Sequence, residues 1–499
     1  MAVKVTERIP HVEDEIAYLF QARTYARGAL WAPVPANRSP FFVPFMIPFQ
    51  GRWISKYPIG WPMLLAVGEL FHAGWLVNPL LGAMTVALIY RIGTDLFDRQ
   101  IGLIAGVLAL TSPFYLIQSS TYMSHAATCF WTTLLVWAWL RLERASRQQA
   151  ATARWAVLAG VAIGMVAITR PLTGVGVALP FGVALVVKLV HQRDLGFLVR
   201  TYGPFVLAAG VVTALEPLSL WIITGNPMTN LYTLVWPYDR IGFGPDISVS
   251  NGHDLHQAWI NAKNDLLLWY SELFGWKDAS WIPLIPGLVF GLAEARRREK
   301  GWPLLLGGFF VSLVIVHLAY WVGAQVYGPR YYYEGLAGLA ILAALGLRGV
   351  IRFLFDLWQK RRVILQSEEP PRLLDSHTWP VYLLLIALIS LNTLTYLPGR
   401  ISDWNNLYTV NRQPIEAVQA IQQTDHVLVL VFGNRWINYG ALMSLSTPWL
   451  DGPTVVAHYM DPTAIPSIVD QFPDREVIYV EGSIASHEPP PPPSLDPTE

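Results

Sequence analysis

The chain has 499 residues, of which 53% are hydrophobic and only 14% are charged, whereas soluble domains carry about 25% charged residues. Thirty-five basic and thirty-five acidic residues cancel, so there is no basic field for a nucleic acid partner, and the single cysteine, Cys129, excludes a disulfide framework and Cys-based metal sites. The mean hydropathy of +0.37 and the twenty-one tryptophans are typical of side chains at membrane–water boundaries, and together they predict a polytopic α-helical membrane protein.

Residues 1–60 form an N-terminal segment whose middle, Trp31–Gln50, is rich in proline and aromatic residues. The stretch Ile59–Trp75 that follows is apolar but is interrupted by Pro62 and Glu69. It is too short to cross a hydrocarbon layer of about 30 Å twice, so we expect an interfacial or re-entrant helix here.

Residues 61–398 hold ten stretches that are nearly free of Asp, Glu, Lys and Arg. Each is a candidate membrane-spanning helix, because a span needs roughly 20 mostly apolar residues, and we expect the shorter ones to extend into their flanking sequence. The stretches are Gly74–Tyr90, Ile101–Gln118, Ala126–Leu140, Trp155–Thr169, Leu172–Val187, Tyr202–Thr224, Trp281–Ala293, Trp302–Ala324, Gly335–Leu347 and Trp379–Leu397.

Most Lys and Arg residues lie in every second loop between these stretches. Short cytoplasmic loops accumulate Lys and Arg, so these loops are assigned to the inner face, and both ends of the chain to the outer face, of a plasma (inner) membrane. Residues 1–60 then lie outside with no apolar segment before them. We therefore expect a first transmembrane helix upstream of Met1, with unaided translocation of the N-terminal tail as the alternative. The outer loops hold few basic residues: Arg170, Arg240, Lys263, Lys277 and Arg330.

The outer loop 225–280 is long, polar and rich in Trp and Tyr. A loop of this length without regular structure is usually functional or disordered, and the aromatic content argues against disorder. We therefore expect this external loop to take part in binding the acceptor.

Residues 399–484 change to short, alternating patterns that predict a small external α/β domain. The tail 485–499, with five consecutive prolines from Pro489, is expected to be extended and disordered. Within the domain, helices are expected at Pro414–Gln422, Trp436–Met443 and Ala464–Gln471, and strands at His426–Phe432, Thr454–Ala457 and Glu476–Val480.

Three consecutive acids, Glu13, Asp14 and Glu15, open a helix-compatible segment. Carboxylates at a helix start are favoured by the helix dipole and by capping, which accounts for them without any chemistry. Alternatively, one carboxylate on the external face acts as a general base for an attacking hydroxyl or binds a metal ion. The residues alone leave both interpretations open.

Two further segments combine a cation with aromatic rings. Lys56 precedes Tyr57, and a lysine at this place either extends its ammonium to the interface or holds a lipid phosphate. Arg330 precedes Tyr331 and Tyr332 between the eighth and ninth stretches, where tyrosines also suit an aromatic belt. A guanidinium beside phenols is suited to a phosphate diester, so we favour a functional role for Arg330.

Four isolated polar residues are weaker candidates. Arg170 lies in the tight outer turn between the fourth and fifth stretches, and Glu334 closes the tyrosine segment. His253 has Asp254 and His256 nearby at a spacing that a metal ion would accept, but a histidine in a loop is more often solvated. Glu216 lies inside the sixth stretch, where an acid marks either function or a helix break lined by protein.

In this order, the pair Asp14-Glu15 and the segments Lys56-Tyr57-Pro58 and Arg330-Tyr331-Tyr332, together with many spans and a small C-terminal domain, resemble the GT-C superfamily of membrane glycosyltransferases. Over roughly residues 10–350 the chain looks most like the bacterial relatives of the protein O-mannosyltransferases and of the aminoarabinose transferase of lipid A. An acidic pair lies in the first external loop of those families. The resemblance therefore implies that Asp14 is the catalytic base or orients the acceptor and that Glu15 supports it.

The resemblance also implies the reaction, which is transfer of a sugar from a polyprenyl-phosphate-linked donor to a hydroxyl of a lipid, glycan or protein at the outer face. A lysine followed by prolines helps to bind the lipid phosphate in relatives, although Tyr57 intervenes here. A single displacement would invert the anomeric carbon, and we expect no cofactor or metal ion. The implied donor-binding residues are Lys56, Tyr57, Arg330, Tyr331 and Tyr332, and the accessory or acceptor residues are Arg170, His253 and Glu334.

Two other classes of function stay open on the residues alone. A polytopic lipid or solute transporter or flippase without transferase activity would also have many spans and an acid such as Glu216, although repeated halves and broken helices are not apparent. A scaffold or sensor that binds an envelope partner through its C-terminal domain would tolerate Asp14→Asn.

Overall fold

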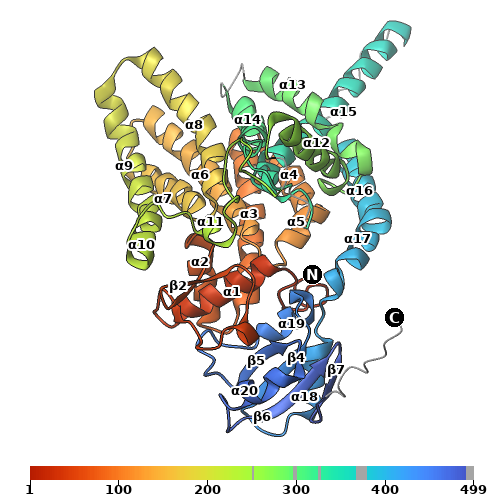
Figure 1. The fold of residues 1–499 in the computed structure, drawn as a ribbon. Coiled ribbons are helices and arrows are strands. Elements are labelled where there is room, and N and C mark those ends of the chain that lie inside the picture. The colour runs from red at the N-terminus through yellow and green to blue at the C-terminus, as the bar shows by residue number, and fades with distance from the viewer. Residues whose placement is uncertain (250–251, 296–300, 324–326, 367–378, 490–499) are drawn as a thin grey trace.

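The computed structural model describes residues 1–249, 252–295, 301–323, 327–366 and 379–489. It shows a bundle of apolar helices with a small α/β domain at one end (Figure 1), so the expected fold class is confirmed. Among the described residues, five helical segments are long and apolar enough to cross a membrane: Gly74–Leu96, Pro171–His191, Leu195–Thr224, Arg330–Trp358 and Trp379–Thr409.

Helices overlap all ten predicted stretches, and several continue beyond them. The predicted span Ile101–Gln118 is divided by Ser112, whose hydroxyl caps the second of two helices. The helices are α3 (Gly74–Leu96), α4 (Arg99–Thr111), α5 (Pro113–Gln118), α6 (His125–Arg147), α7 (Ala153–Thr169), α8 (Pro171–Gln192), α9 (Leu195–Thr213), α10 (Leu215–Thr224), α13 (Leu284–Ala295), α14 (Trp302–His317), α15 (Leu336–Gln366), α16 (Trp379–Leu391), the π-helical η4 (Asn392–Tyr396) and α17 (Leu397–Trp404).

Small residues allow some of these helices to touch backbone to backbone. A side chain at Gly287 in α13 would collide with the carbonyl of Leu342 in α15, and one at Gly346 in α15 would collide with the carbonyl of Pro283. Such close approach is the usual way in which apolar helices pack in lipid, where the hydrophobic effect does not draw them together.

The N-terminal segment contains a small sheet that the sequence analysis did not predict. The predicted interfacial stretch forms a helix, α2, that packs on α1. Gln50 and Gly51 both have positive φ, at 49° and 79°, as two-residue hairpin turns require. The hairpin ends next to Lys56. The elements are α1 (Glu13–Ala26), β1 (Ala32–Pro33), η1 (Ser39–Phe41), β2 (Met46–Phe49), β3 (Arg52–Ser55) and α2 (Gly60–Glu69), with antiparallel strand order β1-β3-β2.

The region 225–280 is not the irregular loop that the sequence analysis assumed. It contains the 18-residue helix α12 (Leu255–Glu272), which Asp254 caps by accepting a hydrogen bond of 2.7 Å from the backbone N–H of Gln257. The short elements α11 (Leu231–Val235) and η2 (Lys277–Trp281) lie on either side of it. The error arose because α12 mixes polar and apolar residues without the long apolar run by which the spans were found.

The C-terminal α/β domain is a four-stranded sheet with strand order β5-β4-β6-β7. The central strand β4 pairs in parallel with β5 and β6 and is buried along nearly its whole length, which explains its unbroken apolar sequence. The predicted helices and strands are confirmed, and β7, which pairs antiparallel with β6, was missed. The elements are η5 (Leu407–Thr409), α18 (Gln413–Ile421), β4 (Val427–Phe432), α19 (Trp436–Met443), β5 (Thr454–Tyr459), η6 (Pro462–Ala464), α20 (Ile465–Val469), β6 (Glu476–Glu481) and β7 (Ile484–Ser486).

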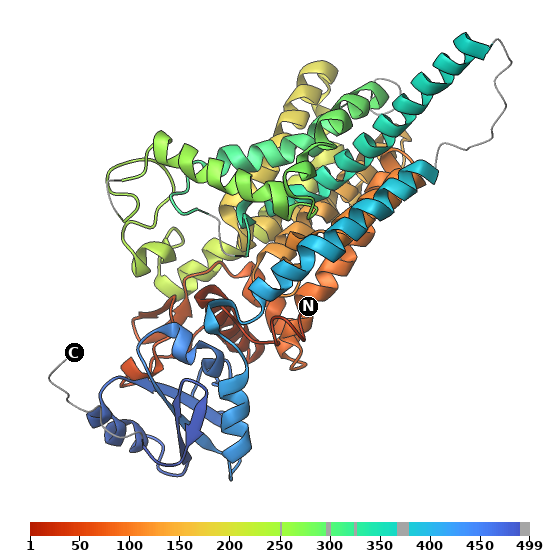
Figure 2. The same ribbon diagram turned by 90° about the vertical axis from the view of Figure 1, so that its right-hand side faces the viewer.

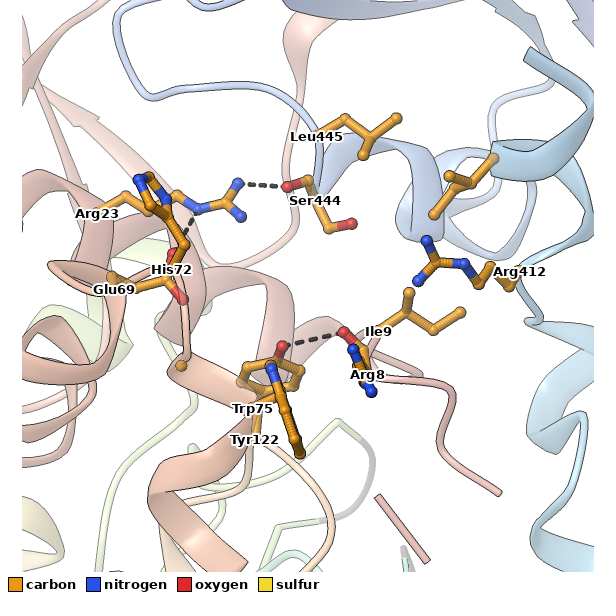
Figure 3. A pocket seen from close by; sticks show the side chains of 12 residues that line it. Arg8, Ile9, Arg23, Glu69, His72, Trp75, Tyr122, Arg412, Ser444 and Leu445 are labelled. Atoms are coloured by element: carbon orange, nitrogen blue, oxygen red, sulfur yellow. Dashed lines mark hydrogen bonds and ion pairs between the residues drawn. The ribbon is translucent and has the colours of Figure 1, made fainter. Parts of the chain in front are cut away.

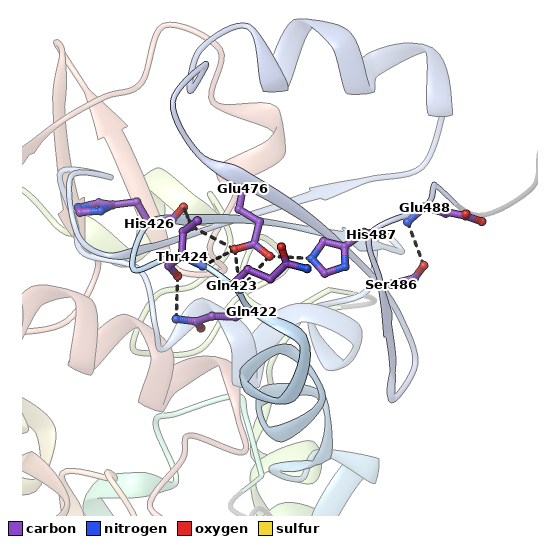
Figure 4. Close-up of polar contacts among 8 residues, drawn as sticks. All are labelled: Gln422, Gln423, Thr424, His426, Glu476, Ser486, His487 and Glu488. Atoms are coloured by element: carbon purple, nitrogen blue, oxygen red, sulfur yellow. Dashed lines mark hydrogen bonds and ion pairs between the residues drawn. The ribbon is translucent and has the colours of Figure 1, made fainter.

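The carboxylate of Glu476 connects the segment before β4 to the segment after β7 (Figure 4). Glu476, at the start of β6, accepts hydrogen bonds from the backbone N–H groups of Gln423 and Thr424, from the Thr424 hydroxyl, and at 2.6 Å from His487 Nε2. The sheet and these bonds reach His487, so the predicted disordered tail cannot begin at residue 485. The remainder of that tail, residues 490–499, lies outside the described residues, as do the basic run 296–300 and the segment 367–378.

The C-terminal domain lies against the N-terminal segment at the same end of the helices, as Figures 1 and 2 show from two directions. The Arg412 backbone N–H donates a hydrogen bond of 2.7 Å to Glu7. Arg27 in α1 makes a bidentate pair with Asp451 at 2.7 and 2.9 Å. These two regions together cover the end of the helix bundle at which the predicted site residues lie.

Candidate active site

Asp14 lies in the first turn of α1, where three acids face the positive end of the helix dipole and no side chain caps the helix. Its carboxylate is partly exposed. Oδ1 accepts a hydrogen bond of 2.6 Å from the hydroxyl of Tyr57, which follows β3. The ring of Tyr57 lies 4.3 Å from that of Tyr18, one turn further along α1. Asp14 is therefore held in place by this hydrogen bond, and the residue as a whole stays partly exposed.

Glu15 has a different environment from its neighbour, because its side chain is only 1% exposed. It accepts backbone hydrogen bonds from His11 at 2.6 Å and Tyr122 at 2.8 Å, and one of 3.2 Å from the hydroxyl of Tyr327. Burial raises the pKa of Glu15 to about 7, against the opposing effect of these donors. Glu15 thus joins α1 to the segment before α6 and to the segment before η3, which is a supporting position.

Lys56 is 5% exposed and lies in a box of aromatic rings, so it does not extend into the membrane interface. Its Nζ lies 3.9 Å from Asp239 Oδ2, in a side chain that is 2% exposed. Burial lowers the pKa of the Lys56 ammonium, and the carboxylates of Asp14 and Asp239 act in the opposite direction. The rings around Nζ are those of Phe45, Trp236, Tyr232 and Tyr57, with centroids at 3.6, 4.7, 5.0 and 5.3 Å.

Arg330 begins the 3₁₀ helix η3 (Arg330–Gly335) and is 8% exposed. The ring of Tyr331 lies beside two guanidinium groups, with Arg330 Cζ at 5.3 Å and Arg170 Cζ at 5.6 Å from its centroid. Arg170 Nε lies 3.8 Å from Glu334 Oε1. That oxygen also accepts a hydrogen bond from the Thr128 hydroxyl. The structure therefore brings both candidate arginines and Glu334 to one place.

The two groups of residues belong to a single site. The charges of Asp14 and Arg330 both act on Lys56, and the charge of Asp14 acts on Arg330. Positions 14, 56, 170 and 330 are far apart in the sequence, and the fold gathers the Asp14 carboxylate and three cations at the end of the bundle that the N-terminal segment covers. Two of these cations, Lys56 and Arg170, also have a carboxylate beside them, in Asp239 and Glu334. This combination is suited to holding an anion beside a base.

Two predicted site residues lie elsewhere. His253 is 1% exposed, its Nε2 lies 2.9 Å from the carbonyl of Leu318, and its ring stacks on Phe243. Tyr332 is 2% exposed and packs edge-on against Phe310 and His317. Among the described residues, neither side chain has a hydrogen bond or ring contact with Asp14 or Lys56. Both side chains are part of the packed interior near the site.

Four residues that surround Lys56 were not predicted from the sequence: Asp239, Phe45, Tyr232 and Trp236. The signals for them were the high Trp and Tyr content of the region 225–280 and the aromatic content of Trp31–Gln50, which marked these regions and no particular residue. The Asp239 carboxylate is itself held by Trp321, whose Nε1 donates a hydrogen bond of 3.1 Å to Oδ1. Three residues of the region 225–280 therefore lie beside Lys56, and the predicted role of this region in binding the acceptor stays a prediction.

A separate pocket lies between the N-terminal segment, the start of α3 and the C-terminal domain (Figure 3). Arg23 crosses one side of it, donating to Glu69 at 2.9 Å and to the carbonyl oxygens of Ser444 and Ser446. On the other side, the Tyr122 hydroxyl donates to the carbonyl of Arg8. None of Asp14, Lys56 and Arg330 lines this pocket. It therefore marks the junction of the domains and lies apart from the candidate active site.

Comparisons with known proteins find one matching family model and several solved structures with a similar fold. The family model of dolichyl-phosphate-mannose-protein mannosyltransferases matches residues 39–226. The sequence has no match among curated proteins. Among solved structures, ArnT from Cupriavidus metallidurans bound to undecaprenyl phosphate is similar, with 15% identity, a TM-score of 0.55, and coverage of 96% of this chain and 87% of that one.

Two further solved structures share the fold. The apo state of the same ArnT has 14% identity and a TM-score of 0.55, over 94% of this chain and 89% of that one. The apo oligosaccharyltransferase of Archaeoglobus fulgidus has 13% identity and a TM-score of 0.50, over 93% of this chain and 62% of that one. The resemblance to GT-C membrane glycosyltransferases that the motifs predicted is confirmed, and with it the enzyme class.

Proposed function

We propose that this glycosyltransferase of the GT-C type transfers a sugar from a polyprenyl-phosphate-linked donor to a hydroxyl acceptor at the outer face of the plasma membrane. The observation that carries the proposal is the convergence of Asp14 and Lys56 on Tyr57, which bonds the carboxylate at 2.6 Å and has its ring centroid 5.3 Å from Lys56 Nζ. The charge of Arg330 acts on the same lysine. The similar ArnT fold with bound undecaprenyl phosphate supports a lipid phosphate as the part of the donor that these cations hold.

The cations supply the electrostatic part of the reaction. A polyprenyl-phosphate sugar is a diester with one negative charge, and the departing polyprenyl phosphate gains a second as the bond breaks. Lys56 and Arg330 are largely removed from water, so they stabilise this developing charge more strongly than solvated cations would. The aromatic rings around Lys56 exclude water from the phosphate and provide apolar surface for the first prenyl units.

Asp14 supplies the proton transfer. The acceptor oxygen attacks the anomeric carbon and forms the new C–O bond while Asp14 takes the hydroxyl proton. The bond from the anomeric carbon to the phosphate oxygen breaks, and its electron pair leaves with the polyprenyl phosphate. One displacement of this kind inverts the anomeric configuration. Tyr57 orients the carboxylate through its 2.6 Å hydrogen bond.

We expect the transfer to proceed without a divalent metal ion. The three buried or half-buried cations Lys56, Arg170 and Arg330 supply the positive charge that a metal ion would otherwise contribute beside a phosphate. Treatment of the purified protein with a chelator should leave the rate of transfer unchanged, and a loss that added Mg²⁺ or Mn²⁺ reverses would contradict this expectation.

The acceptor approaches Asp14 from the end of the helix bundle that lies outside the membrane. The partly exposed Asp14 lies at the end of the bundle that carries the N-terminal segment and the C-terminal domain, and the charge asymmetry of the loops assigns that end to the outside. The acceptor is a hydroxyl of an envelope lipid, glycan or protein that reaches Asp14 from this side.

The test measures transfer from radiolabelled polyprenyl-phosphate hexoses to cell-envelope acceptors in membranes that contain the protein. Asp14→Asn should lower the rate about 100-fold or more and leave retention of the labelled donor unchanged. The exposed Asp470→Asn serves as the matched control, since it makes the same chemical change in the C-terminal domain. Full activity of Asp14→Asn would overturn the assigned base, and lipid movement across vesicles without transfer by the wild type would establish a flippase instead.

A further inference from the structure

His125 is a buried histidine beside the site that the mechanism above does not use. It begins α6 and is 1% exposed. Neither of its ring nitrogens has a hydrogen-bond partner. Buried polar atoms are nearly always paired, so two unpaired nitrogens on one ring are free to bind a polar partner.

Glu334 has an unpaired atom in the same neighbourhood. Its Oε1 accepts from Thr128 and lies 3.8 Å from Arg170, but Oε2 has no partner although the side chain is 2% exposed. Thr128 lies one turn after His125 on α6, and its hydroxyl oxygen also lies 2.9 Å from the backbone carbonyl oxygen of His125. Glu334 therefore contacts the first turn of α6, the turn that carries His125.

This neighbourhood adjoins the reacting groups. The charges of Arg170 and Arg330 both act on the His125 ring. On the other side, the hydroxyl of Ser124 lies 3.3 Å from that of Tyr18, whose ring packs on Tyr57, the hydrogen-bond donor to Asp14. A ligand held between Asp14 and Arg330 thus has the unpaired atoms of His125 and Glu334 within its surroundings.

The unpaired atoms match the chemistry of sugar hydroxyls. A neutral imidazole offers one N–H donor and one acceptor, and a carboxylate oxygen offers acceptors only, while each sugar hydroxyl both donates and accepts. A few polar groups placed among aromatic side chains commonly fix the orientation of a small ligand. In the proposed mechanism, Lys56 and Arg330 bind the phosphate, and Asp14 binds the attacking hydroxyl. The hydroxyl groups of the transferred sugar are the remaining polar groups that need partners.

We propose that His125 and Glu334 form the subsite that binds the hydroxyl groups of the transferred sugar. The inference rests on the proposed function, because it takes the donor to be a polyprenyl-phosphate sugar. It goes further by assigning recognition of the sugar to α6 and η3, separately from recognition of the lipid phosphate by Lys56 and Arg330.

The experiment compares binding of sugar-free undecaprenyl phosphate with binding of its mannosyl, glucosyl and galactosyl esters to the full-length protein in lipid nanodiscs. The variant His125→Phe keeps an aromatic ring and removes both nitrogens. We expect it to weaken binding of the best sugar ester about tenfold and to change binding of undecaprenyl phosphate less than twofold. His125→Asn, which retains a donor and an acceptor, should recover part of the loss.

Thr133→Val is the matched control, because Thr133 is buried on the same helix. Among the described residues, its hydroxyl donates a hydrogen bond to the Cys129 carbonyl within that helix. The subsite would be overturned if His125→Phe weakened binding of the sugar ester and of undecaprenyl phosphate equally, or if it changed binding of neither lipid. It would also be overturned if the wild-type protein bound the sugar esters no more tightly than undecaprenyl phosphate. Wild-type protein that binds none of these lipids would instead overturn the proposed function, so the two failures are distinguishable.

Discussion

At the scale of single residues, the hydroxyl of Tyr57 has one described hydrogen-bond acceptor, Asp14 Oδ1 at 2.6 Å. A phenol that donates to a carboxylate fixes its orientation through a charge-assisted hydrogen bond. The ring of Tyr57 at the same time packs against Tyr18, Phe45 and Tyr232. The hydroxyl and the ring therefore have separable roles, one in orienting the base and one in lining the site.

The variant Tyr57→Phe separates them. Removing the hydroxyl should lower kcat about tenfold because the base loses its orientation. The KM for the donor should stay within twofold, since the ring remains. Steady-state kinetics with a labelled donor checks this. A raised KM with unchanged kcat would show that Tyr57 contacts the donor directly, as the sequence resemblance implied.

The carboxyl group of Glu13 makes donor binding at the same site depend on pH. Burial, followed by the charge of Asp14, raises the pKa of Glu13 to about 7. Glu13 is neutral below that pH and anionic above it, and its charge acts on Lys56. A negative charge that appears near the phosphate-binding cations weakens their attraction for an anionic donor.

Donor affinity should therefore fall as the pH rises through about 7 in the wild type, and Glu13→Gln should remove most of this change. The measurement is the dissociation constant of undecaprenyl phosphate between pH 6 and 8. The phosphate monoester itself gains charge in this range, which would strengthen binding, so the comparison with Glu13→Gln isolates the contribution of the carboxyl. Identical pH profiles for both proteins would contradict the assignment.

At the scale of elements, α1 is held between the membrane helices and the C-terminal domain. Arg23, with its side chain 28% exposed, donates to Glu69 and to the backbone carbonyls of Ser444 and Ser446. Arg27 pairs with Asp451, but both side chains are more than 40% exposed. The first contact is shielded from water and the second is not.

Replacing these arginines should therefore have unequal effects. Arg23→Ala leaves three acceptors without their donor and should cost about 2–3 kcal/mol of stability. Arg27→Ala breaks an exposed pair and should cost less than about 1 kcal/mol. Thermal unfolding of the two variants in the same detergent makes the comparison. Equal losses would show that Arg23 does not connect the domain to α1.

The Glu476 cluster makes the C-terminal domain sensitive to acid (Figure 4). Partial burial opposes ionisation, but hydrogen bonds from His487, Gln423 and Thr424 outweigh it and lower the pKa of Glu476 to about 2. A carboxyl whose pKa is lowered on folding stabilises the fold above its ordinary value near 4.5, and that stabilisation is lost as the pH falls toward 2.

Glu476→Gln should destabilise the domain at pH 7 and reduce the dependence of its stability on pH between about 4.5 and 2. The exposed Glu416→Gln in α18 provides the control. The domain can be followed within the full-length protein by proteolysis at sites beyond residue 404. Parallel pH profiles for wild type and Glu476→Gln would show that other groups dominate acid unfolding.

At the scale of the whole molecule, the N-terminal segment and the C-terminal domain pack together at one end of the helices, and so must lie on one side of the membrane. The distribution of Lys and Arg among the loops predicts that this side is the outside. Cys129 is buried, so an introduced cysteine is the accessible thiol for labelling.

An impermeant maleimide applied to intact cells should label Ser483→Cys, which is exposed in the C-terminal domain, and should not label Gln149→Cys, which is exposed between α6 and α7. Permeabilised cells should label both. Labelling of Gln149→Cys alone in intact cells would place the domain inside and overturn the proposed outer-face reaction.

The membrane helices and most elements of the C-terminal domain were predictable because their signals are local. Each span must satisfy its backbone hydrogen bonds within its own sequence, so apolar length identifies it. The strands β4 to β6 are likewise marked by short β-branched runs. The N-terminal hairpin and α12 were missed because neither shows a clear apolar period, and their conformation depends on packing against α1, α10 and the helices of the bundle.

The sequence by itself determined the membrane-spanning class, the small α/β domain and the candidates Asp14, Lys56 and Arg330, because a few charged residues between apolar stretches are conspicuous. Only the tertiary structure decided that Asp14 is accessible while Glu15 is buried, that Asp239 and three rings of distant segments surround Lys56, and that His125 stands unpaired beside the site. These properties depend on burial and on which distant residues meet. Neither is encoded in the local pattern of the chain, because both arise when the helices pack.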